Sequence, residues 1–211
     1  MDEQDVTAAG WRGSRDGWLE AGYQALIEGG VDAVRIMPLA KRLGLSRTSF
    51  YWFFKDREAL LAALLDGWAA RTTTPLVAAT THYAETQAEA MLNVIGCFLL
   101  SETFDARLEF AIRSWALQDQ AVADRVAAAD DSRLSALSRM LQGWGHDAAS
   151  ADVRARTVYL VQIGYISMRA VEDLQTRLDR IPTYVEIYTG TRPAPREIAR
   201  FNARFQDRGA A

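Results

Sequence analysis

Apolar residues along the chain recur mainly at spacings of three and four, which is the period of an amphipathic α-helix. Residues 15–28 form the first such segment, and the pair Gly29 and Gly30 ends it. The sequence has no run of alternating apolar and polar residues bounded by hairpin turns, so we predict no β-strands. The pattern indicates an all-α fold.

Two short helices are predicted next, over residues 36–43 and 47–54. Pro38 lies in the first turn of the earlier helix, where its missing N–H costs little. Between the two helices, Gly44 permits a left-handed turn and Ser46 can cap the second helix. Because two short helices joined by a three-residue turn with glycine form a helix-turn-helix unit, we predict this unit over residues of about 35 to 54.

Longer helical patterns occupy the rest of the chain. A helix from residue 57 to residue 72 follows the capping residue Asp56 and is expected to end before Pro75. Further helices are predicted at residues 85–101, 105–117, 121–143, 151–178 and 196–205, with interruptions before the last one at Pro182, Gly190, Pro193 and Pro195. We therefore predict an N-terminal three-helix domain over residues 12–72 and a C-terminal helical bundle over residues 73–211.

The charge of the chain is unevenly distributed. The net charge is -3, yet residues 35–57 carry six basic residues against the single acid Asp56, which is 6 - 1 = +5 and leaves -3 - 5 = -8 elsewhere. A basic patch on an acidic body presents one face to nucleic acid and keeps the other face away from it. The alternative is a cluster of charges that is only solvated.

Other features limit the functional class. Cys97 is the only cysteine, so it cannot form an internal disulfide, and its apolar surroundings predict a buried thiol. The acidic segment 1–5 does not resemble a secretory signal, and residues 91–100 are too few to span a bilayer, so we expect a cytoplasmic protein. His82 and His146 are far apart, and no phosphate-binding glycine loop or nucleophile motif is present. We therefore expect no enzyme activity, no metal and no cofactor.

The segment around the turn resembles the signature of the TetR (tetracycline-repressor) family. The turn Gly44-Leu45-Ser46 is followed by Ser49-Phe50-Tyr51-Trp52-Phe53-Phe54-Lys55-Asp56-Arg57-Glu58-Ala59-Leu60-Leu61. The resemblance covers residues of about 12 to 72, and residues 109–116 are similar to a stretch common in one branch of these regulators. It implies a helix-turn-helix DNA-binding domain, followed by a helical domain that binds a small-molecule effector and forms a homodimer. The implied function is a ligand-responsive regulator of transcription, in the usual case a repressor whose ligand weakens DNA binding.

The resemblance also implies roles for individual residues. The DNA-binding candidates are Arg35, Ser46, Arg47, Thr48, Ser49, Tyr51, Trp52 and Lys55. Residues 46–49 match positions that meet bases and the nearest phosphates, whereas Tyr51 and Lys55 match phosphate contacts. The sequence departs from the pattern at Thr48, where glycine is common, at Phe53, where histidine or tyrosine is common, and at Arg35, where a hydroxyl usually caps the helix. These departures leave the operator sequence open.

The predicted dimer rests on residues Val158–Met168, which are apolar nearly all round and need cover on two sides. We expect the same helix of a second subunit on one side, with a C-terminal helix that bears Ile198, Phe201 and Phe205 completing the interface. Two-fold pairing of subunits also supplies a second recognition helix for the second half-site of a double-stranded operator. The alternative is a central helix in a monomer.

The effector candidates in the second domain are Phe98, Phe110, Arg113, Trp115, Gln162 and Tyr165. Aromatic rings with a few polar groups suit a ligand cavity, but ordinary core packing explains the same residues. Two other functions stay open: a ligand-binding or interaction module that has lost DNA contact, and an all-α enzyme. A buried or distorted recognition helix would favour the module, and a pair of acid–base groups in a cavity would favour the enzyme.

Overall fold

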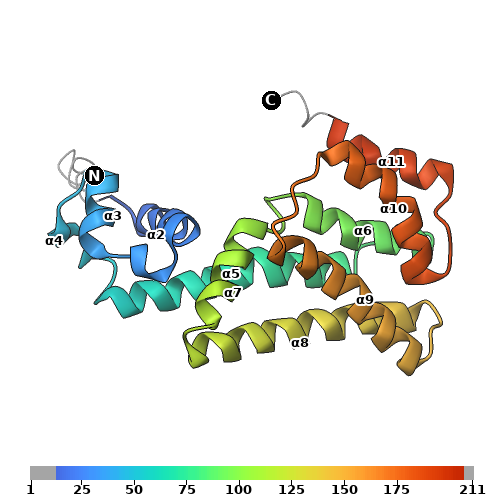
Figure 1. Cartoon of the computed structure of the whole chain (residues 1–211), viewed down its shortest axis with the longest axis horizontal. Coiled ribbons are helices and arrows are strands. Elements are labelled where there is room, and N and C mark those ends of the chain that lie inside the picture. Colours follow the sequence, from blue (N-terminus) through green and yellow to red (C-terminus); the bar gives the residue numbers. More distant parts are fainter. Residues whose placement is uncertain (1–12, 207–211) are drawn as a thin grey trace, which may run out of the picture. The chain divides into compact units, whose positions relative to one another are not determined.

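The computed structural model describes residues 13–206, and this part of the chain contains ten α-helices, one 3-10 turn and no strand (Figure 1). The prediction of an all-α fold is confirmed. The predictions for segment 1–5 and for the start of the first domain at residue 12 lie outside the described residues.

The chain folds into two compact units. The N-terminal unit holds the residues up to Ala70 together with Arg107–Val126, and the helical unit holds Arg71–Ala106 and the residues from Ala127 onward. The predicted seam near residue 73 lies close to the first of these divisions. The functional assignment of residues 12–72 and 73–211 stays a prediction.

The N-terminal unit begins with helix α2 (Arg15–Gly29), the 3-10 turn η1 (Val31–Ala33) and helix α3 (Ile36–Leu43). Helix α4 follows at Arg47–Phe50, so it ends four residues earlier than predicted. Beyond it a turn brings Phe54 back against Phe50, with 5.5 Å between the ring centroids, and both rings are buried. The burial of two aromatic rings therefore replaces the last helical turn that the periodicity indicated.

Helix α5 (Arg57–Ala79) does not end before Pro75, so the predicted end at residue 72 is wrong. An internal proline costs about 3 kcal/mol because a backbone hydrogen bond is lost and the ring meets the preceding turn. The residues beyond it offset this cost, since Leu76 and Ala79 are buried in the core of the helical unit. Tertiary packing outweighs the local preference here.

The remaining helices are α6 (Gln87–Leu99), α7 (Ala106–Ala116), α8 (Gln120–Gly143), α9 (Ala148–Ser167), α10 (Leu174–Thr189) and α11 (Pro195–Gln206). The single helix predicted over residues 151–178 is wrong, because α9 ends at Ser167 and α10 begins at Leu174. Arg169 adopts a positive φ of 49° just after α9, and the Asp173 side chain accepts a hydrogen bond from the Thr176 N–H at the start of α10. Pro182 lies inside α10 and does not interrupt it.

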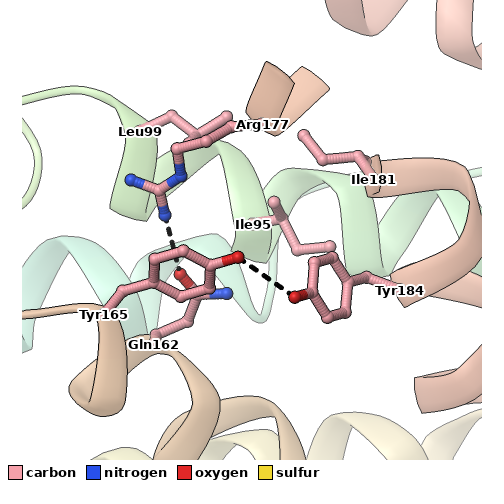
Figure 2. Close-up of a pocket in the computed structure, with 7 residues that line it drawn as sticks. All are labelled: Ile95, Leu99, Gln162, Tyr165, Arg177, Ile181 and Tyr184. Atoms are coloured by element: carbon pink, nitrogen blue, oxygen red, sulfur yellow. Dashed lines mark hydrogen bonds between the residues drawn. The ribbon is translucent and has the colours of Figure 1, made fainter. Parts of the chain in front are cut away.

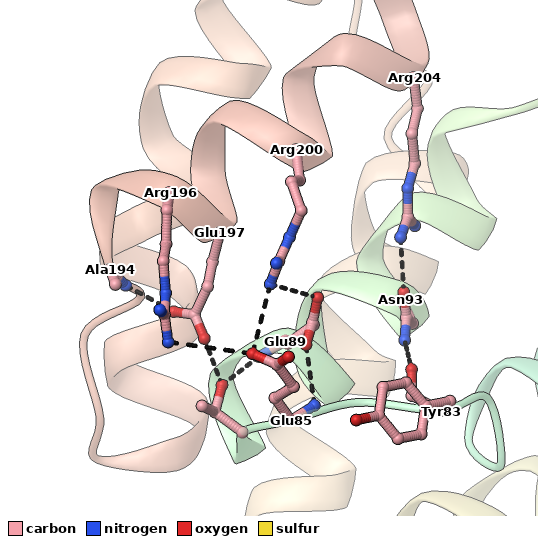
Figure 3. Close-up of polar contacts among 10 residues, drawn as sticks. Tyr83, Glu85, Glu89, Asn93, Ala194, Arg196, Glu197, Arg200 and Arg204 are labelled. Atoms are coloured by element: carbon pink, nitrogen blue, oxygen red, sulfur yellow. Dashed lines mark hydrogen bonds and ion pairs between the residues drawn. The ribbon is translucent and has the colours of Figure 1, made fainter.

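The core of the helical unit surrounds α6, whose residues from Met91 to Phe98 are all buried. The C-terminal helix α11 packs Phe201 and Phe205 into this same core, with exposed fractions of 2% and 4%. Arg200 also pairs with Glu89 at 2.8 Å, and Arg204 donates to the side-chain oxygen of Asn93 at 3.0 Å (Figure 3). The predicted use of the apolar face of this helix in a dimer interface is therefore corrected, because that face is covered within its own chain.

A fully buried arginine joins three helices of the helical unit. The Arg133 guanidinium, on α8, donates to the side-chain oxygens of Thr72 and Thr73 on α5 at 2.8 and 3.0 Å. It also donates to the Tyr159 hydroxyl on α9 at 2.7 Å, and that hydroxyl donates to Asp130 at 2.6 Å. Its charge is 3.8 Å from the Asp130 carboxylate, so the buried cation is both paired and hydrogen-bonded.

None of the helices within residues 13–206 combines the length and the apolar content needed to cross a bilayer. In the same part of the chain, no group of three or more His, Cys, Asp or Glu side chains is placed to hold a metal ion.

Candidate nucleic-acid interface and pocket

The turn between α3 and α4 has the backbone geometry that the sequence predicts. Gly44 has φ of 66° and ψ of 27°, which is the left-handed conformation that glycine adopts without steric cost. The N–H of Leu45 donates to the Ala40 carbonyl at 2.9 Å, and the N–H of Gly44 donates to the Lys41 carbonyl at 3.2 Å. These two bonds close the end of α3 and direct the chain into the next helix.

The start of α4 is capped and exposed. The Ser46 side chain accepts a hydrogen bond from the Ser49 N–H at 3.3 Å, and the Ser49 hydroxyl donates to the Ser46 carbonyl at 2.7 Å. Ser49 is buried, whereas Ser46, Arg47 and Thr48 are exposed. Of the four predicted base-facing residues, Arg47 and Thr48 therefore present free surface, and the Ser49 hydroxyl is engaged in holding the helix start.

Aromatic packing fixes α4 from behind. Phe50 is fully buried and meets Trp18 of α2 edge to face, with the ring centroids 5.2 Å apart. Leu39 and Ala40 of α3 are also buried. This cluster sets the angle between the two helices and keeps the opposite face of α4 outward.

Two predicted phosphate contacts lie just beyond α4. The Tyr51 ring lies under the Arg47 guanidinium at 5.7 Å from the centroid, and Arg47 donates to the Tyr51 hydroxyl at 3.0 Å. Trp52 is 63% exposed, and Lys55 is exposed at the end of the turn. The predicted candidates Arg47, Tyr51, Trp52 and Lys55 therefore all reach the surface of the N-terminal unit.

Arg57 was not among the predicted site residues, yet it positions the unit. Its guanidinium donates to the Val34 carbonyl at 2.6 Å and to the Val31 carbonyl at 2.7 Å, which ties the start of α5 to the turn before α3. The N–H of Ala59 donates to the Asp56 carboxylate at 2.8 Å, so the predicted capping role of Asp56 is confirmed. The sequence showed Arg57 only as one of several basic residues.

The basic residues of segment 35–57 divide into two groups. Arg42 pairs with Glu28, and Arg57 is directed toward carbonyl groups. The other four are exposed and form no ion pair with any residue that the structure describes: Arg35, Lys41, Arg47 and Lys55. Arg35 and Arg47 lie at the N-terminal, positive ends of α3 and α4, and exposed cations without an ion pair suit phosphate groups.

The six effector candidates do not form one group. Gln162 and Tyr165 line a pocket between α6, α9 and α10, together with Ile95, Leu99, Arg177, Ile181 and Tyr184 (Figure 2). Phe98 packs against Phe104 in the core, with 4.7 Å between the ring centroids. Phe110, Arg113 and Trp115 belong to α7 in the other unit, where Arg113 pairs with Glu109 at 2.9 Å.

The sequence prediction missed Arg177 as a pocket residue because it placed residues 151–178 on one helix. Fifteen residues of continuous helix would separate Gln162 from Arg177 by about 22 Å. The break after Ser167 returns the chain, and the Arg177 guanidinium lies 3.4 Å from the Gln162 side-chain oxygen. Asp173, as a helix-capping residue, was the signal available for this break.

The N-terminal unit thus defines a class: an all-α protein with an exposed, capped helix-turn-helix. Residues 19–64 match the family described as bacterial regulatory proteins, tetR family. The chain is also 38% identical over 56 residues to the tetracycline repressor protein class A from transposon 1721 of Escherichia coli, a match that covers 26% of each chain.

Solved structures share the fold over most of the chain. A putative TetR-family transcriptional regulator from Mesorhizobium loti has a TM-score of 0.57 at 14% identity, over 90% of this chain and 95% of that one. SmeT, the repressor of the multidrug efflux pump SmeDEF of Stenotrophomonas maltophilia, has a TM-score of 0.60 at 18% identity, over 90% and 95%. Reduced NemR from E. coli has a TM-score of 0.58 at 18% identity, over 85% and 99%. Residues 19–64 therefore match the tetR family, and the chain shares the fold of these solved structures over most of its length.

Proposed function

We propose that this chain is a transcriptional repressor that binds a two-fold symmetric operator as a homodimer and releases it when a small molecule binds the helical unit. The observation that carries the proposal is the start of α4, where Arg47 and Thr48 are exposed on a capped helix. The first residues of a recognition helix are the part that reaches base edges in the major groove.

The unpaired cations supply the affinity in this proposal. Each N-terminal unit has four such cations, so a dimer has eight. If all eight contact phosphates, the logarithm of the DNA-binding constant would fall with the logarithm of the salt concentration with a slope of about -7. Thr48 would contribute sequence preference, since its methyl group can meet a thymine methyl. Ser49 would act by holding the helix start, because its hydroxyl is engaged with Ser46.

A binding assay across a series of salt concentrations tests the phosphate contacts. We expect Lys55→Ala to weaken binding to every duplex and to flatten the salt slope of the dimer by about 1.8. Arg42→Ala is the matched control, because it removes one cation from the same segment, but this cation is already paired with Glu28. Equal slopes for the two variants would contradict the proposed interface.

Selection of bound sequences from a random duplex pool tests specificity. We expect a palindromic consensus whose half-site centres lie about 10 base pairs apart, or a multiple of that. Thr48→Ala should change the preferred base at one position in each half-site while the salt slope stays the same. Enrichment of no sequence would contradict a specific operator.

The dimer in this proposal uses α9 and α10. Val153 and Leu160 of α9 and Ile187 of α10 are each about 60% exposed although they are large and apolar. Arg154 links the two helices by donating to the Tyr188 carbonyl at 2.9 Å. We place a second copy of the chain on this surface, because a two-fold symmetric operator requires two recognition helices and therefore two subunits.

Light scattering tests the dimer, since the wild-type mass should be twice the 23.5 kDa of the chain. We expect Leu160→Glu combined with Ile187→Glu to give monomers that keep their helical content and bind the operator much more weakly. An unchanged mass would place the interface elsewhere.

The ligand response completes the proposal. Helix α5 contributes residues to both units. A ligand that shifts the C-terminal part of α5 would therefore change how the N-terminal units of the dimer are presented to the operator. By linkage, operator DNA must weaken ligand binding by the same factor. We assign no catalytic role, and a protein that regulates bacterial genes in this way acts in the cytoplasm.

A further inference from the structure

We propose that the pocket between α6, α9 and α10 binds a small organic carboxylate with an apolar body. This inference rests on the proposed ligand response and names the chemical class of the ligand. All seven residues that line the pocket belong to the helical unit (Figure 2).

Arg177 is the first reason for an anionic ligand. Its guanidinium lies over the Tyr165 ring at 4.7 Å from the centroid, and its hydrogen bond to the Gln162 oxygen is long, at 3.4 Å. Arg177 has no ion pair with any residue that the structure describes. A carboxylate would replace this long bond to a neutral amide with an ion pair, and Arg177 has no ion pair with a described residue that would have to break.

The hydroxyl groups beside Arg177 are the second reason. The Tyr165 and Tyr184 hydroxyls lie 3.1 Å apart, and this hydrogen bond raises the pKa of Tyr184. Tyr188 is 1% exposed, its hydroxyl makes no hydrogen bond of normal geometry, and burial raises its pKa. Tyr184 and Tyr188 therefore keep their protons at neutral pH, and Tyr184 in the lining can donate a hydrogen bond to a carboxylate oxygen.

The rest of the lining is aliphatic. Ile95 and Leu99 of α6 and Ile181 of α10 face the same space as the polar groups (Figure 2). A ligand that is charged at one end and apolar at the other matches a lining made of both polar and aliphatic side chains. Glu172, a nearby acidic group, pairs with Arg180 and does not line the pocket, so the lining offers no carboxylate to a cationic ligand.

The size of the pocket limits the ligand. The cavity measures about 20 Å³, which is room for about one water molecule, so a ligand must displace side chains to enter. The contacts that it would displace are the long bond between Arg177 and Gln162 and the pair of tyrosine hydroxyls. Neither contact is an ion pair, and a carboxylate can accept hydrogen bonds from the Arg177 guanidinium and the Tyr184 hydroxyl in their place.

Calorimetry on the whole chain without DNA tests the ligand class. The carboxylate probes are benzoate and octanoate, their neutral partners are benzamide and octanamide, and the cationic probe is benzyltrimethylammonium. We expect at least one carboxylate to bind at least tenfold more tightly than its amide, and the cation not to bind.

Substitutions assign the binding to the pocket. Arg177→Gln should weaken carboxylate binding at least tenfold and leave amide binding unchanged, and Arg177→Lys should restore part of the loss. Arg156→Gln is the matched control, because Arg156 is an exposed arginine of α9 that pairs with Asp152 outside the pocket. A thermal melt of each variant separates loss of the ligand from loss of the fold.

The outcomes distinguish this inference from the proposed function. Equal binding of carboxylate and amide, tight binding of the cation alone, no binding of any probe, or no effect of Arg177→Gln overturns the ligand class and leaves DNA binding to its own test. Carboxylate binding that depends on Arg177 supports the ligand class. If such a carboxylate does not release operator DNA, the ligand class stands and the proposed ligand response fails.

Discussion

The two units of the chain use cationic side chains in opposite ways. In the N-terminal unit Arg35, Arg47 and Lys55 are exposed and form no ion pair with the described residues. In the helical unit Arg133 is fully buried and is bonded to Thr72, Thr73 and Tyr159. Both sets of side chains are positively charged. What distinguishes them is whether hydrogen-bond and ion-pair partners within the chain surround the charge.

The difference follows from the cost of removing a charge from water. An exposed cation keeps its hydration and can exchange it for a phosphate oxygen, which makes binding dependent on salt. A buried guanidinium costs several kcal/mol unless each of its donors is satisfied, and it is then committed to holding helices together. Arg177 lies between these cases, because it is partly buried and its hydrogen bond is long.

The largest expected effect comes from removing the buried cation. Arg133→Met keeps most of the volume but removes the donor to the Thr72 and Tyr159 hydroxyls and the cation that pairs with the Asp130 carboxylate. We expect a loss of about 3–5 kcal/mol in the free energy of unfolding, measured by urea titration.

Arg139→Met is the matched control, because Arg139 is an exposed arginine of the same helix. Its change should stay within about 0.5 kcal/mol. A similar loss of unfolding free energy in both variants would show that the burial of Arg133 does not determine its contribution to stability.

Most helices could be predicted from the sequence, but partners of charged side chains could not. Helix α3 has the predicted bounds, because Gly44 and the apolar residues Leu39 and Ala40 are local signals. The sequence does not distinguish Arg42, which pairs with Glu28, from Lys55, which forms no ion pair with the described residues. Pairing depends on which side chains lie close in space, and spacing along the chain carries little of that information.

The N-terminal unit holds its helices by close packing instead. A Cβ atom on Gly67 would lie 1.8 Å from the Tyr23 hydroxyl oxygen, which donates to the Leu64 carbonyl at 3.2 Å. We expect Gly67→Ala to destabilise this unit by about 1–3 kcal/mol, because the ring must move. Tyr23→Phe alone should cost about 1 kcal/mol.

The double variant makes this prediction specific. Removing the hydroxyl in Tyr23→Phe takes away the closest clash, so the combination with Gly67→Ala should be less destabilised than the sum of the single variants. Thermal unfolding of all four proteins measures this coupling. Additive effects would show that the contact between residue 67 and the Tyr23 hydroxyl does not cause the loss of stability in Gly67→Ala.

Two errors in the predicted helix boundaries have different physical causes. Pro75 predicted a helix end at residue 72, and periodicity predicted a continuous helix through Arg169; both predictions were wrong. Burial of Leu76 overrides the proline, and capping by Asp173 together with the positive φ of Arg169 ends one helix and starts the next. The pocket depends on this second feature, so its polar lining could be predicted only in part, at Gln162 and Tyr165.

A smaller effect is expected where an arginine is paired but exposed. Arg200 pairs with Glu89 at 2.8 Å on the surface between α11 and α6, and its side chain is 50% exposed (Figure 3). Solvent screens such a pair, so Arg200→Gln should cost less than about 1 kcal/mol. Phe201→Ala, on the buried face of the same helix, should cost about 3–5 kcal/mol. Urea titration of both variants checks this order, and a reversed order would mean that ion pairs hold α11 in place.

The smallest expected effect concerns a neutral buried group, the thiol of Cys97. Burial raises its pKa from 9.0 to about 11, so the folded state keeps the proton that the unfolded state begins to lose near pH 9. The stability contributed by the neutral thiol is therefore complete below pH 9 and is lost as the pH rises toward 11. We expect the difference in urea midpoint between the wild type and Cys97→Ala to be constant up to about pH 9 and to shrink above it. Tyr188, whose pKa is also raised, is present in both proteins and cancels in this difference. A difference that stays flat to about pH 11 would mean that water reaches the thiol in the folded state.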